Sequence, residues 1–384
     1  MRHHAHAFLE TSPASLTRLQ LQNFRNYERL ELSLSPGVTV FQGDNGQGKT
    51  NILEAVYYLA VLRSFRTNRI ADLIRMGCEG FRSRLHLTST TDTEMSVSAD
   101  YAQQRRRLFV DDCSCGPQEF INQFNCVSLV PEDIELAKGP PAVRRRYLNI
   151  LLSQLYPEYL DSLIRYTKVL KNRNAMLRSS ERYGKAAITA YDSQFTEHGA
   201  RLMRLRTMIV AELNERLTAL LPRLKADKTS LELRYQPAIS APAFETEEED
   251  GQQTAMITVL NENIARDMEQ GQTRYGPHRD ELGLYIGGNP LSGFGSEGQC
   301  RLAALALKLV AASQLVKEMQ NEKSLVLLVD DVFGELDSER RNGFFKTVAE
   351  AGQVLLTCTE TPAEILERSP RILNVKKGKV ENDG

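Results

Sequence analysis

Residues 43–50 read GDNGQGKT, and they decide the fold class of this 384-residue chain. They fit the pattern G-x-x-x-x-G-K-[ST], whose glycines let backbone N–H groups turn toward phosphate oxygens. The apolar run 38–41 before them predicts a strand, and apolar residues between 52 and 59 recur at helical spacing. A strand, a glycine-rich loop and a helix N-terminus together indicate a phosphate-binding site. The alternative interpretation is a glycine-rich turn that binds nothing.

Each residue of this loop has an expected role toward ATP. Lys49 is expected to reach the β- and γ-phosphates, and the Thr50 hydroxyl is expected to bind Mg²⁺. The other residues surround the phosphates with backbone N–H groups. The predicted nucleotide-binding residues of the loop are therefore Gly43, Asp44, Asn45, Gly46, Gln47, Gly48, Lys49 and Thr50.

A second candidate element is the apolar run Leu325–Val329, which is followed by Asp330 and Asp331. Carboxylates at the C-terminal end of a buried strand lie at the crevice where α/β sheets bind ligands. We expect Asp330 to bind Mg²⁺ and Asp331 to orient or deprotonate the attacking water. Lys49 and Asp331 are thus the predicted catalytic residues. Strands also end in Asp as plain turn residues, and the phosphate loop is what favours the catalytic interpretation.

The spacing of these two elements indicates an inserted lobe. About 280 residues separate Lys49 from Asp330, whereas a minimal nucleotide-binding domain keeps them far closer. The pattern from 144 to 221 is helical, with a leucine seam that Pro222 ends. Charge divides here as well. Residues 144–228 hold 17 basic and 8 acidic side chains, whereas residues 229–270 hold 2 and 9. Residues 245–250 are predicted to form an exposed acidic loop.

Apolar alternation elsewhere predicts strands on both sides of the insertion. An antiparallel pair is expected within residues 16–34, and the basic residues 103–107 are expected at a turn. The further predicted strands are 83–87, 95–101, 107–110, 282–286 and 353–357, and a long helix is predicted at 297–319. The predicted domains are 1–15, a flexible extension or tag; 16–142, the N-terminal half of a head; 143–270, a helical arm lobe; and 271–384, the C-terminal half of the head.

Composition narrows the class of protein. Lys and Arg total 48 against 49 Asp and Glu, so any nucleic acid must be bound by a local patch. Hydrophobic residues make up 41% and charged residues 25%, typical of a globular chain. No apolar run reaches the roughly 20 residues that span a bilayer, and we expect no secretory leader. Six scattered cysteines favour a reducing cytoplasm. Cys113 and Cys115 are interpreted as free thiols and not as a zinc site.

Two further motifs resemble parts of ABC-type ATPases. Residues 291–299 read LSGFGSEGQ before the predicted long helix and resemble the signature loop, and Glu335-Leu336-Asp337 resembles the D-loop. In that superfamily, two heads enclose ATP between the phosphate loop of one and the signature helix of the other. The resemblance implies that Ser296, Gly298, Gln299 and Asp337 contact the nucleotide. Alone, a Ser-x-Gly-Gln sequence is most often a helix cap.

Together with other motifs, these residues resemble the RecF family of bacterial DNA replication and repair proteins. The motifs that carry the resemblance are LQLQNFRNY at 19–27, RSFRT at 63–67, PED at 131–133, KG at 138–139, RRRYL at 144–148 and GPHRD at 276–280. They extend over residues 16–380. The resemblance implies an α/β fold of ABC type, in which a P-loop sheet and an antiparallel β subdomain form an ATPase head with an inserted helical arm.

The resemblance also implies a function. Proteins of this family are cytoplasmic, bind single- and double-stranded DNA in an ATP-dependent way, and form homodimers on ATP. They act with RecR and RecO to load RecA at gaps, and they support SOS induction. Two departures from ABC-type heads imply slow hydrolysis here. Asp331 stands where Glu is usual, and Leu356-Thr357-Cys358 lacks the usual His.

DNA-contacting residues are less clear from the sequence. Arg144, Arg145 and Arg146 are the most concentrated candidates, and arginines at the base of a helical arm also form structural ion pairs. Residues 105–107 and the lysines at 376, 377 and 379 are further candidates. His278 beside Asp280 is interpreted as structural. The alternative functions are a soluble ATPase subunit of an ABC-type transporter and a nuclease-associated repair head, whose long coiled coil and Cys-x-x-Cys hook this chain lacks.

Overall fold

The computed structural model describes residues 15–88, 93–121, 123–224, 226, 230–239, 249–318, 325–332, 344 and 352–382. The chain divides into two compact units. The first combines Met1–Pro131 with Ala312–Gly384, and the second is Glu132–Ala311. The predicted boundaries at 142 and 270 stay predictions, and the compact units divide at other positions.

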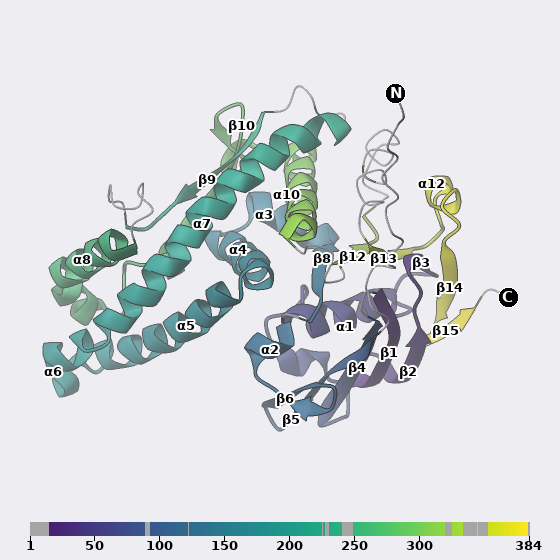
Figure 1. The fold of residues 1–384 in the computed structure, drawn as a ribbon, viewed down its shortest axis with the longest axis horizontal. Coiled ribbons are helices and arrows are strands. Elements are labelled where there is room, and N and C mark those ends of the chain that lie inside the picture. Colours follow the sequence, from purple (N-terminus) through teal and green to yellow (C-terminus); the bar gives the residue numbers. More distant parts are fainter. Residues whose placement is uncertain are drawn as a thin grey trace, which may run out of the picture. The chain divides into compact units, whose positions relative to one another are not determined.

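The first unit contains a mostly parallel sheet (Figure 1). Its strand order is β15-β14-β3-β13-β12-β8, with parallel pairing except between β14 and β15. The central strands are buried along their lengths, as expected of a sheet covered on both faces. The strands predicted at 38–41, 325–329 and 353–357 are confirmed. The bounds are β3 Gly37–Gln42, β8 Asn125–Leu129, β12 Leu325–Asp330, β13 Gln353–Cys358, β14 Arg371–Lys376 and β15 Lys379–Asn382.

An antiparallel sheet in the same unit has the order β2-β1-β4-β5-β6-β7. Its bounds are β1 Ser15–Phe24, β2 Tyr27–Ser33, β4 Gly80–Thr88, β5 Glu94–Ala102, β6 Arg105–Val110 and β7 Cys113–Ser114. These strands confirm the predicted antiparallel runs. The turn predicted at 103–107 is shorter than expected. Gln103 and Gln104 make it with positive φ, and residues 105–107 already belong to β6.

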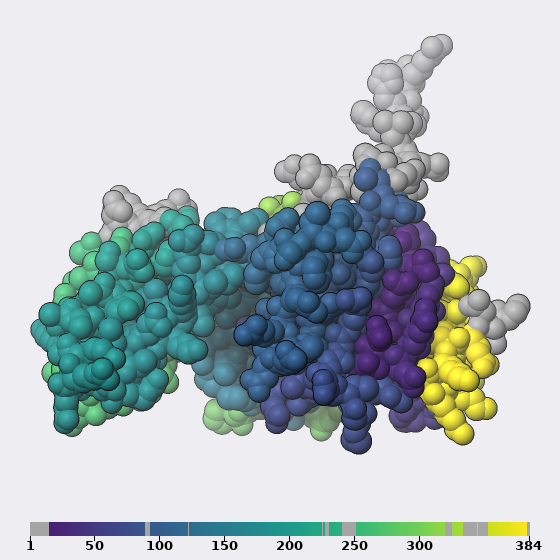
Figure 2. Space-filling view, turned by 90° about the horizontal axis from the view of Figure 1, so that it is seen from below, coloured from purple at the N-terminus to yellow at the C-terminus, as the bar shows by residue number. Residues whose placement is uncertain are grey.

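Helix α1, Lys49–Val61, contacts strands of both sheets and is buried on almost every side. It therefore lies between the two sheets and carries the phosphate loop at its N-terminus (Figure 1). Gln353 joins the sheets directly, because its side-chain amide exchanges hydrogen bonds with the backbone N–H and C=O of Leu16 at 2.8 and 3.0 Å. In the space-filling view, the C-terminal residues in yellow lie beside N-terminal residues in purple (Figure 2). The shorter elements are η1 Ile70–Leu73, α2 Pro117–Ile121 and α12 Ala363–Leu366.

The second unit is mainly helical, as predicted for its central part. Pro157 opens α5, and the leucine seam from 202 to 220 is the buried face of α7, which packs on α5 and α8. Its helices are α3 Glu135–Lys138, α4 Pro141–Leu155, α5 Pro157–Leu177, α6 Ser180–Thr189, α7 Asp192–Leu220, α8 Glu249–Gln270 and α9 Leu291–Phe294, with 3-10 turns η2 Pro131–Ile134, η3 Leu221–Leu224 and η5 Pro277–Arg279. Helix α10, Glu297–Glu318, begins in this unit, and its residues from Ala312 onward belong to the first. A small antiparallel sheet has the order β11-β10-β9, from β9 Leu231–Gln236, β10 Glu281–Ile286 and β11 Asn289–Pro290.

Two features of this unit differ from the predictions or go beyond them. Glu249 and Asp250 begin α8 and are not part of a loop, and residues 245–248 of the predicted acidic loop lie outside the described residues. Helix α10 is the single helix in the described residues that is long and apolar enough to cross a membrane. Some 72% of its most apolar stretch is buried in the protein, as in a core helix.

All six cysteines of the chain are free.

Buried arginines connect the helices of this unit to the turn before β10. Arg206 of α7 donates to Asp280 Oδ2 and to the carbonyl of Pro277, both at 2.7 Å. Arg173 of α5, which is fully buried, pairs with Asp192 and Asp267 at 2.9 Å each. Removing one partner of such a pair leaves an uncompensated buried charge, which typically destabilises by 3–5 kcal/mol. Arg206 thus fixes α7 against Pro277 and Asp280, and Arg173 joins α5 to α7 and α8.

His278 lies within the same region and has a structural environment. Its Nδ1 is 2.6 Å from the Tyr166 hydroxyl, and its Nε2 is 3.0 Å from the carbonyl of Thr273. With Nε2 protonated and Nδ1 accepting, a neutral ring satisfies both bonds. Burial, together with nearby arginines, lowers the pKa of His278 to about 4. The ring is therefore neutral at pH 7, in agreement with the structural interpretation.

This pKa shift predicts a pH dependence of stability. Since the pKa of His278 is lower in the folded chain than in the unfolded one, its contribution is complete above pH 6.5 and falls as the pH drops toward 4. Between pH 7 and pH 4.5, wild type should lose about 2–3 kcal/mol more unfolding free energy than His278→Gln, which cannot titrate. Urea unfolding at both pH values measures this. Equal losses in the two proteins would contradict the assignment.

Candidate nucleotide site

The phosphate loop runs between β3 and α1, and its glycines are required by sterics. Gly43, Gly46 and Gly48 have φ of 150°, 78° and 111°, a region that favours glycine. A Cβ at Gly43 would overlap the Val375 carbonyl oxygen, and a Cβ at Gly48 would lie 2.5 Å from Asn26 Nδ2. Asp44, Asn45 and Gly46 are exposed at the tip of the loop. The loop thus folds back closely on its neighbours and leaves its tip open.

Lys49 lies across the inside of the loop. Its side chain is buried at 6% exposure, and Nζ donates hydrogen bonds to the carbonyls of Gly43 and Asp44, the latter at 2.9 Å. A buried ammonium needs such acceptors because desolvation of an unpaired charge is costly. Phosphate oxygens are stronger acceptors than these carbonyls. The position of Lys49 is therefore suited to an anionic ligand held by the loop.

The structure brings Thr50 and Asp330 together although they are 280 positions apart. The Thr50 hydroxyl donates to Asp330 Oδ1 at 2.9 Å, from the first turn of α1 to the last residue of β12. Mg²⁺ prefers hard oxygen ligands and takes one or two from the protein, with the rest from water and phosphates. A hydroxyl and a carboxylate that already face each other fit this requirement.

Thr357 is a contact that sequence reasoning missed. It is fully buried on β13 and donates from Oγ1 to Asp330 Oδ1 at 2.6 Å. Thr357 Oγ1 also accepts a hydrogen bond from the backbone N–H of Asp331 at 3.1 Å. Thr357 therefore holds both acidic residues at the end of β12. In the sequence, residues 356–358 differ from ABC-type heads by lacking the usual His, and no pattern there indicates the contact of Thr357 with Asp330.

Asp331 has a different environment from Asp330. It is exposed and adopts a left-handed backbone with φ of 48°, whereas Asp330 is buried. A non-glycine residue in this region costs free energy and is common at functional sites. The backbone turn separates the two carboxylates into a buried one beside Thr50 and a solvent-facing one. The different roles expected of Asp330 and Asp331 stay predictions, and this difference in exposure is compatible with them.

Two neighbouring segments fix the outside of the phosphate loop. Asn26 lies in the β1–β2 turn and donates to the Gln47 carbonyl at 3.4 Å, and Asn51 donates to Asn26 at 2.8 Å. From the C-terminal hairpin, the backbone N–H of Lys377 donates to Gln47 Oε1 at 2.7 Å. Further contacts are made by Arg66 to Asn51, Tyr27 to the Gly48 carbonyl and Gly378 to the Gln47 carbonyl. The motifs at 19–27 and 63–67 thus support the loop.

A buried carboxylate organises the same region. Glu54 is fully buried on α1 and accepts two hydrogen bonds from Arg25, at 2.7 and 2.6 Å. Ser64 also donates to it. This bidentate pair compensates the charge of Glu54. It ties the β1–β2 turn to the helix that carries Lys49 and Thr50.

The predicted signature residues form a helix cap in the second unit. The Ser296 N–H donates to Gln299 Oε1 at 2.9 Å, and the Gln299 N–H donates to Ser296 Oγ at 3.3 Å. This reciprocal pair is a capping box at the start of α10. Ser296, Gly298 and Gln299 are all exposed, and no atom of the described residues would lie within 4 Å of a Cβ at Gly298. Asp337 lies outside the described residues.

The three candidate DNA-contacting arginines on α4 are engaged by the protein. Arg144 is buried and forms a bidentate pair with Glu281 at 2.7 and 2.9 Å. It also donates to the carbonyls of Leu136 and Gly139. Arg145 donates to the carbonyl of Asp280 at 2.7 Å, and Arg146 also has a partner within the protein. This environment favours the structural role that the sequence left open, most clearly for Arg144.

The class of protein follows from three features: the phosphate loop, the paired Thr50 hydroxyl and Asp330 carboxylate, and the helix capped by Ser296. They define a P-loop ATPase of the ABC and SMC type. The family model described as RecF/RecN/SMC N terminal domain matches residues 15–381. The chain belongs to the RecF family. The resemblance and the fold class stated from the sequence are confirmed.

The relatives cover nearly the whole chain. A "DNA replication and repair protein RecF" of Leptospira interrogans serogroup Icterohaemorrhagiae serovar Lai (strain 56601) is 34% identical over 375 residues, 96% of this chain and 99% of the relative. Its counterpart in Clostridium novyi (strain NT) is 34% identical over 347 residues, 90% of this chain and 92% of the relative. These similarities extend through both compact units.

Two solved structures agree with this fold. The structure described as recombination mediator protein RecF-ATP in the RecFOR pathway has a TM-score of 0.88 at 28% identity and covers 100% of both chains. The one described as RecF-ATPrS has a TM-score of 0.86 at 29% identity and covers 97% of this chain and 99% of the other. Both descriptions name a nucleotide bound by those relatives.

The Thr357 contacts yield a prediction for Mg²⁺. Thr357→Val keeps the side-chain shape and removes the donor to Asp330. We expect the Mg²⁺ concentration for half-maximal nucleotide binding to rise about tenfold, since partners of metal ligands typically contribute 10–100-fold. Thr357→Ser keeps the hydroxyl and should restore the wild-type value. Fluorescent ATP titrated at increasing Mg²⁺ measures this, and an unchanged requirement in the Val variant would refute the role.

Proposed function

We propose that this chain is an ATP-dependent DNA-binding protein of DNA replication and recombinational repair. The observation that carries the proposal is the 2.9 Å contact between Thr50 and Asp330 at the end of an intact phosphate loop. The curated relatives that carry the name DNA replication and repair protein span nearly the whole chain and support the rest.

In this proposal the residues of the loop divide the work of binding ATP. Residues 43–48 surround the phosphates with backbone N–H groups, and Lys49 exchanges its loop carbonyls for β- and γ-phosphate oxygens. Thr50 and Asp330 hold Mg²⁺, which would neutralise charge on the phosphates. Asp331 orients or deprotonates the attacking water from its exposed position.

Slow hydrolysis is part of the proposal. Asp331 is one methylene shorter than the Glu usual in ABC-type heads, so its carboxylate reaches less far from the strand end. Thr357 occupies the region of the usual His and is engaged with Asp330 and Asp331. A slow ATPase keeps the nucleotide bound for longer, and bound nucleotide stabilises whichever state binds it better.

ATP-dependent dimerisation explains why the signature residues face solvent. In the proposed dimer, Ser296, Gly298 and Gln299 of one copy meet the γ-phosphate held by the other. Asp337, in the motif that resembles the D-loop, is proposed to contact the same nucleotide. An exposed helix N-terminus with an ordered serine hydroxyl offers donors and a positive dipole end to an anion. The capping box holds that hydroxyl in place without a second copy.

The proposed partners are those of the recombination-mediator pathway. DNA, single- or double-stranded and including gapped duplexes, is the macromolecular ligand, RecR is the direct protein partner, and RecO and RecA act downstream in the cytoplasm. A transporter ATPase subunit is not favoured. That role gives no reason for the unit Glu132–Ala311 with its long helices α5 and α7.

Lys49→Met tests the role of ATP. The variant keeps an unbranched side chain one atom shorter and loses the charge, so it should fold while ATP no longer promotes association. Sedimentation velocity with wild type should show a monomer-to-dimer shift on adding ATP and Mg²⁺, and the variant should show none. Lys376→Met is a matched control from the neighbouring hairpin and should behave as wild type. Dimerisation of wild type that ignores ATP would disprove the proposed switch.

A further inference from the structure

The antiparallel sheet of the first unit carries a row of arginines on its outer face. Alternate residues, such as Leu85 and Val97, are buried toward α1, so the residues between them face outward. Strand register places one outward row across five strands. The row is Arg29 on β2, Gln22 on β1, Arg82 on β4, Asp100 on β5 and Arg107 on β6.

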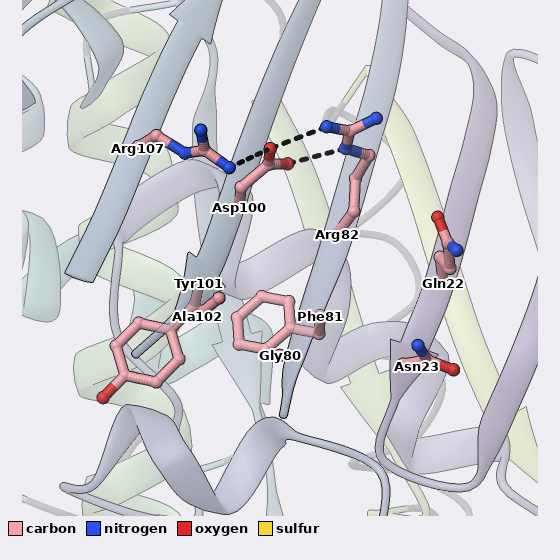
Figure 3. Close-up of a pocket in the computed structure, with 9 residues that line it drawn as sticks. All are labelled: Gln22, Asn23, Gly80, Phe81, Arg82, Asp100, Tyr101, Ala102 and Arg107. Atoms are coloured by element: carbon pink, nitrogen blue, oxygen red, sulfur yellow. Dashed lines mark hydrogen bonds and ion pairs between the residues drawn. The ribbon is translucent and has the colours of Figure 1, made fainter. Parts of the chain in front are cut away.

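A hollow of about 280 Å³ opens in this row (Figure 3). Arg82, Asp100 and Arg107 form one side of it, the rings of Phe81 and Tyr101 form another, and Gln22 and Asn23 lie across from them. The two rings stack with centroids 5.9 Å apart. A Cβ at Gly80 would overlap the Tyr101 carbonyl oxygen, so this position needs glycine and leaves that part of the wall without a side chain.

The charges of the hollow do not cancel. Asp100 is buried and receives a bidentate bond from Arg82 Nε and Nη2, both at 2.8 Å, with Arg107 at 3.7 Å. Two guanidinium groups therefore share one carboxylate, which leaves one net positive charge. The arginine side chains are 62% and 69% exposed. Since the carboxylate fixes them at the rim, both can donate further hydrogen bonds to an anion.

The arrangement suits an extended anion better than a small one. Arg29, Arg82 and Arg107 are each two strands apart, which places them at intervals of about 10 Å across the sheet. Phe81 and Tyr101 alternate with the outward residues of the row, and Phe81 packs on Tyr58 of α1, so the outer face offers a ligand guanidinium groups and the amide of Gln22. A nucleic-acid strand carries a negative charge at every phosphate and can therefore contact arginines at such intervals.

We propose that the hollow lined by Arg82, Asp100 and Arg107 binds a phosphodiester of the DNA backbone, with the arginine row following the strand. This rests on the proposed function and names the surface that it uses. Such a site binds without sequence preference, and its affinity falls as salt rises because bound phosphates release counterions. The α4 arginines, which the protein itself engages, are then not required for the contact.

The test compares two charge-neutral double variants. Arg82→Gln with Asp100→Asn removes the pair in the hollow without leaving an unpaired carboxylate. Arg18→Gln with Glu31→Gln removes another exposed pair of the same face, and Arg18 lies four residues from Gln22 along β1. Fluorescence anisotropy with a labelled gapped duplex, ATP and Mg²⁺ gives Kd at several salt concentrations. Thermal unfolding and ATP binding, measured in parallel, show that each protein is folded and loaded.

The first double variant should raise Kd about three- to tenfold and reduce the slope of log K against log salt by about one. The control pair should stay within about twofold of wild type. Arg107→Gln should act like the first variant. Arg234→Gln, which removes an exposed arginine on β9 with the same change in charge, should not.

If wild type binds DNA and the hollow variants bind equally well, the hollow is not the site. Polyglutamate is added as a competitor in the anisotropy assay. If the hollow variants lose affinity for polyglutamate and keep their affinity for DNA, an acidic protein is the ligand instead. If wild type binds no DNA with ATP, the proposed function itself fails.

Discussion

The hydrogen bond between Thr50 and Asp330 is the constraint on which the nucleotide site depends. It joins the first turn of α1 to the end of β12, and Thr357 adds the end of a second strand, β13, through the same carboxylate oxygen of Asp330. Parallel pairing of β3, β13 and β12 places these ends at one edge of the sheet. The second unit, Glu132–Ala311, lies in the sequence between the two halves of the unit that holds this site. Sheet pairing, and not chain proximity, therefore assembles the site.

The sequence predicts features that depend on neighbouring residues, and it does not predict contacts between residues far apart along the chain. The phosphate loop, its flanking strand and helix, and the apolar strands are local patterns, and the sequence predicted them within a few residues. Helix α8 was missed because its acidic start masks a weak apolar stripe. The acid pair after β12 was found because a strand end is itself a local signal. Thr357 carries no such signal, since its role depends on strand pairing.

Buried charge was the other feature beyond prediction. Arg173, Arg206 and Arg144 read in the sequence as members of a basic helical lobe, and a basic lobe suggests a polyanion. In the structure each lies below a helix surface against carboxylates from distant segments. A count of charges along the chain cannot separate paired from exposed arginines, because partners such as Asp280 and Glu281 are more than 70 residues away. The exposed arginines of the antiparallel sheet are dispersed along the sequence, and only the register of the strands brings them into one row.

The capping box of Ser296 and Gln299 has a consequence for the rate of association. Ordering a free polar side chain at an interface costs about 0.5–1.5 kcal/mol. Here the folding of α10 has already immobilised the hydroxyl and the amide, since each is bonded to the backbone of the other residue. A partner surface that meets this end encounters preorganised donors, so recognition needs no slow rearrangement of the segment. The lifetime of such a complex is then set by the interactions that hold it together.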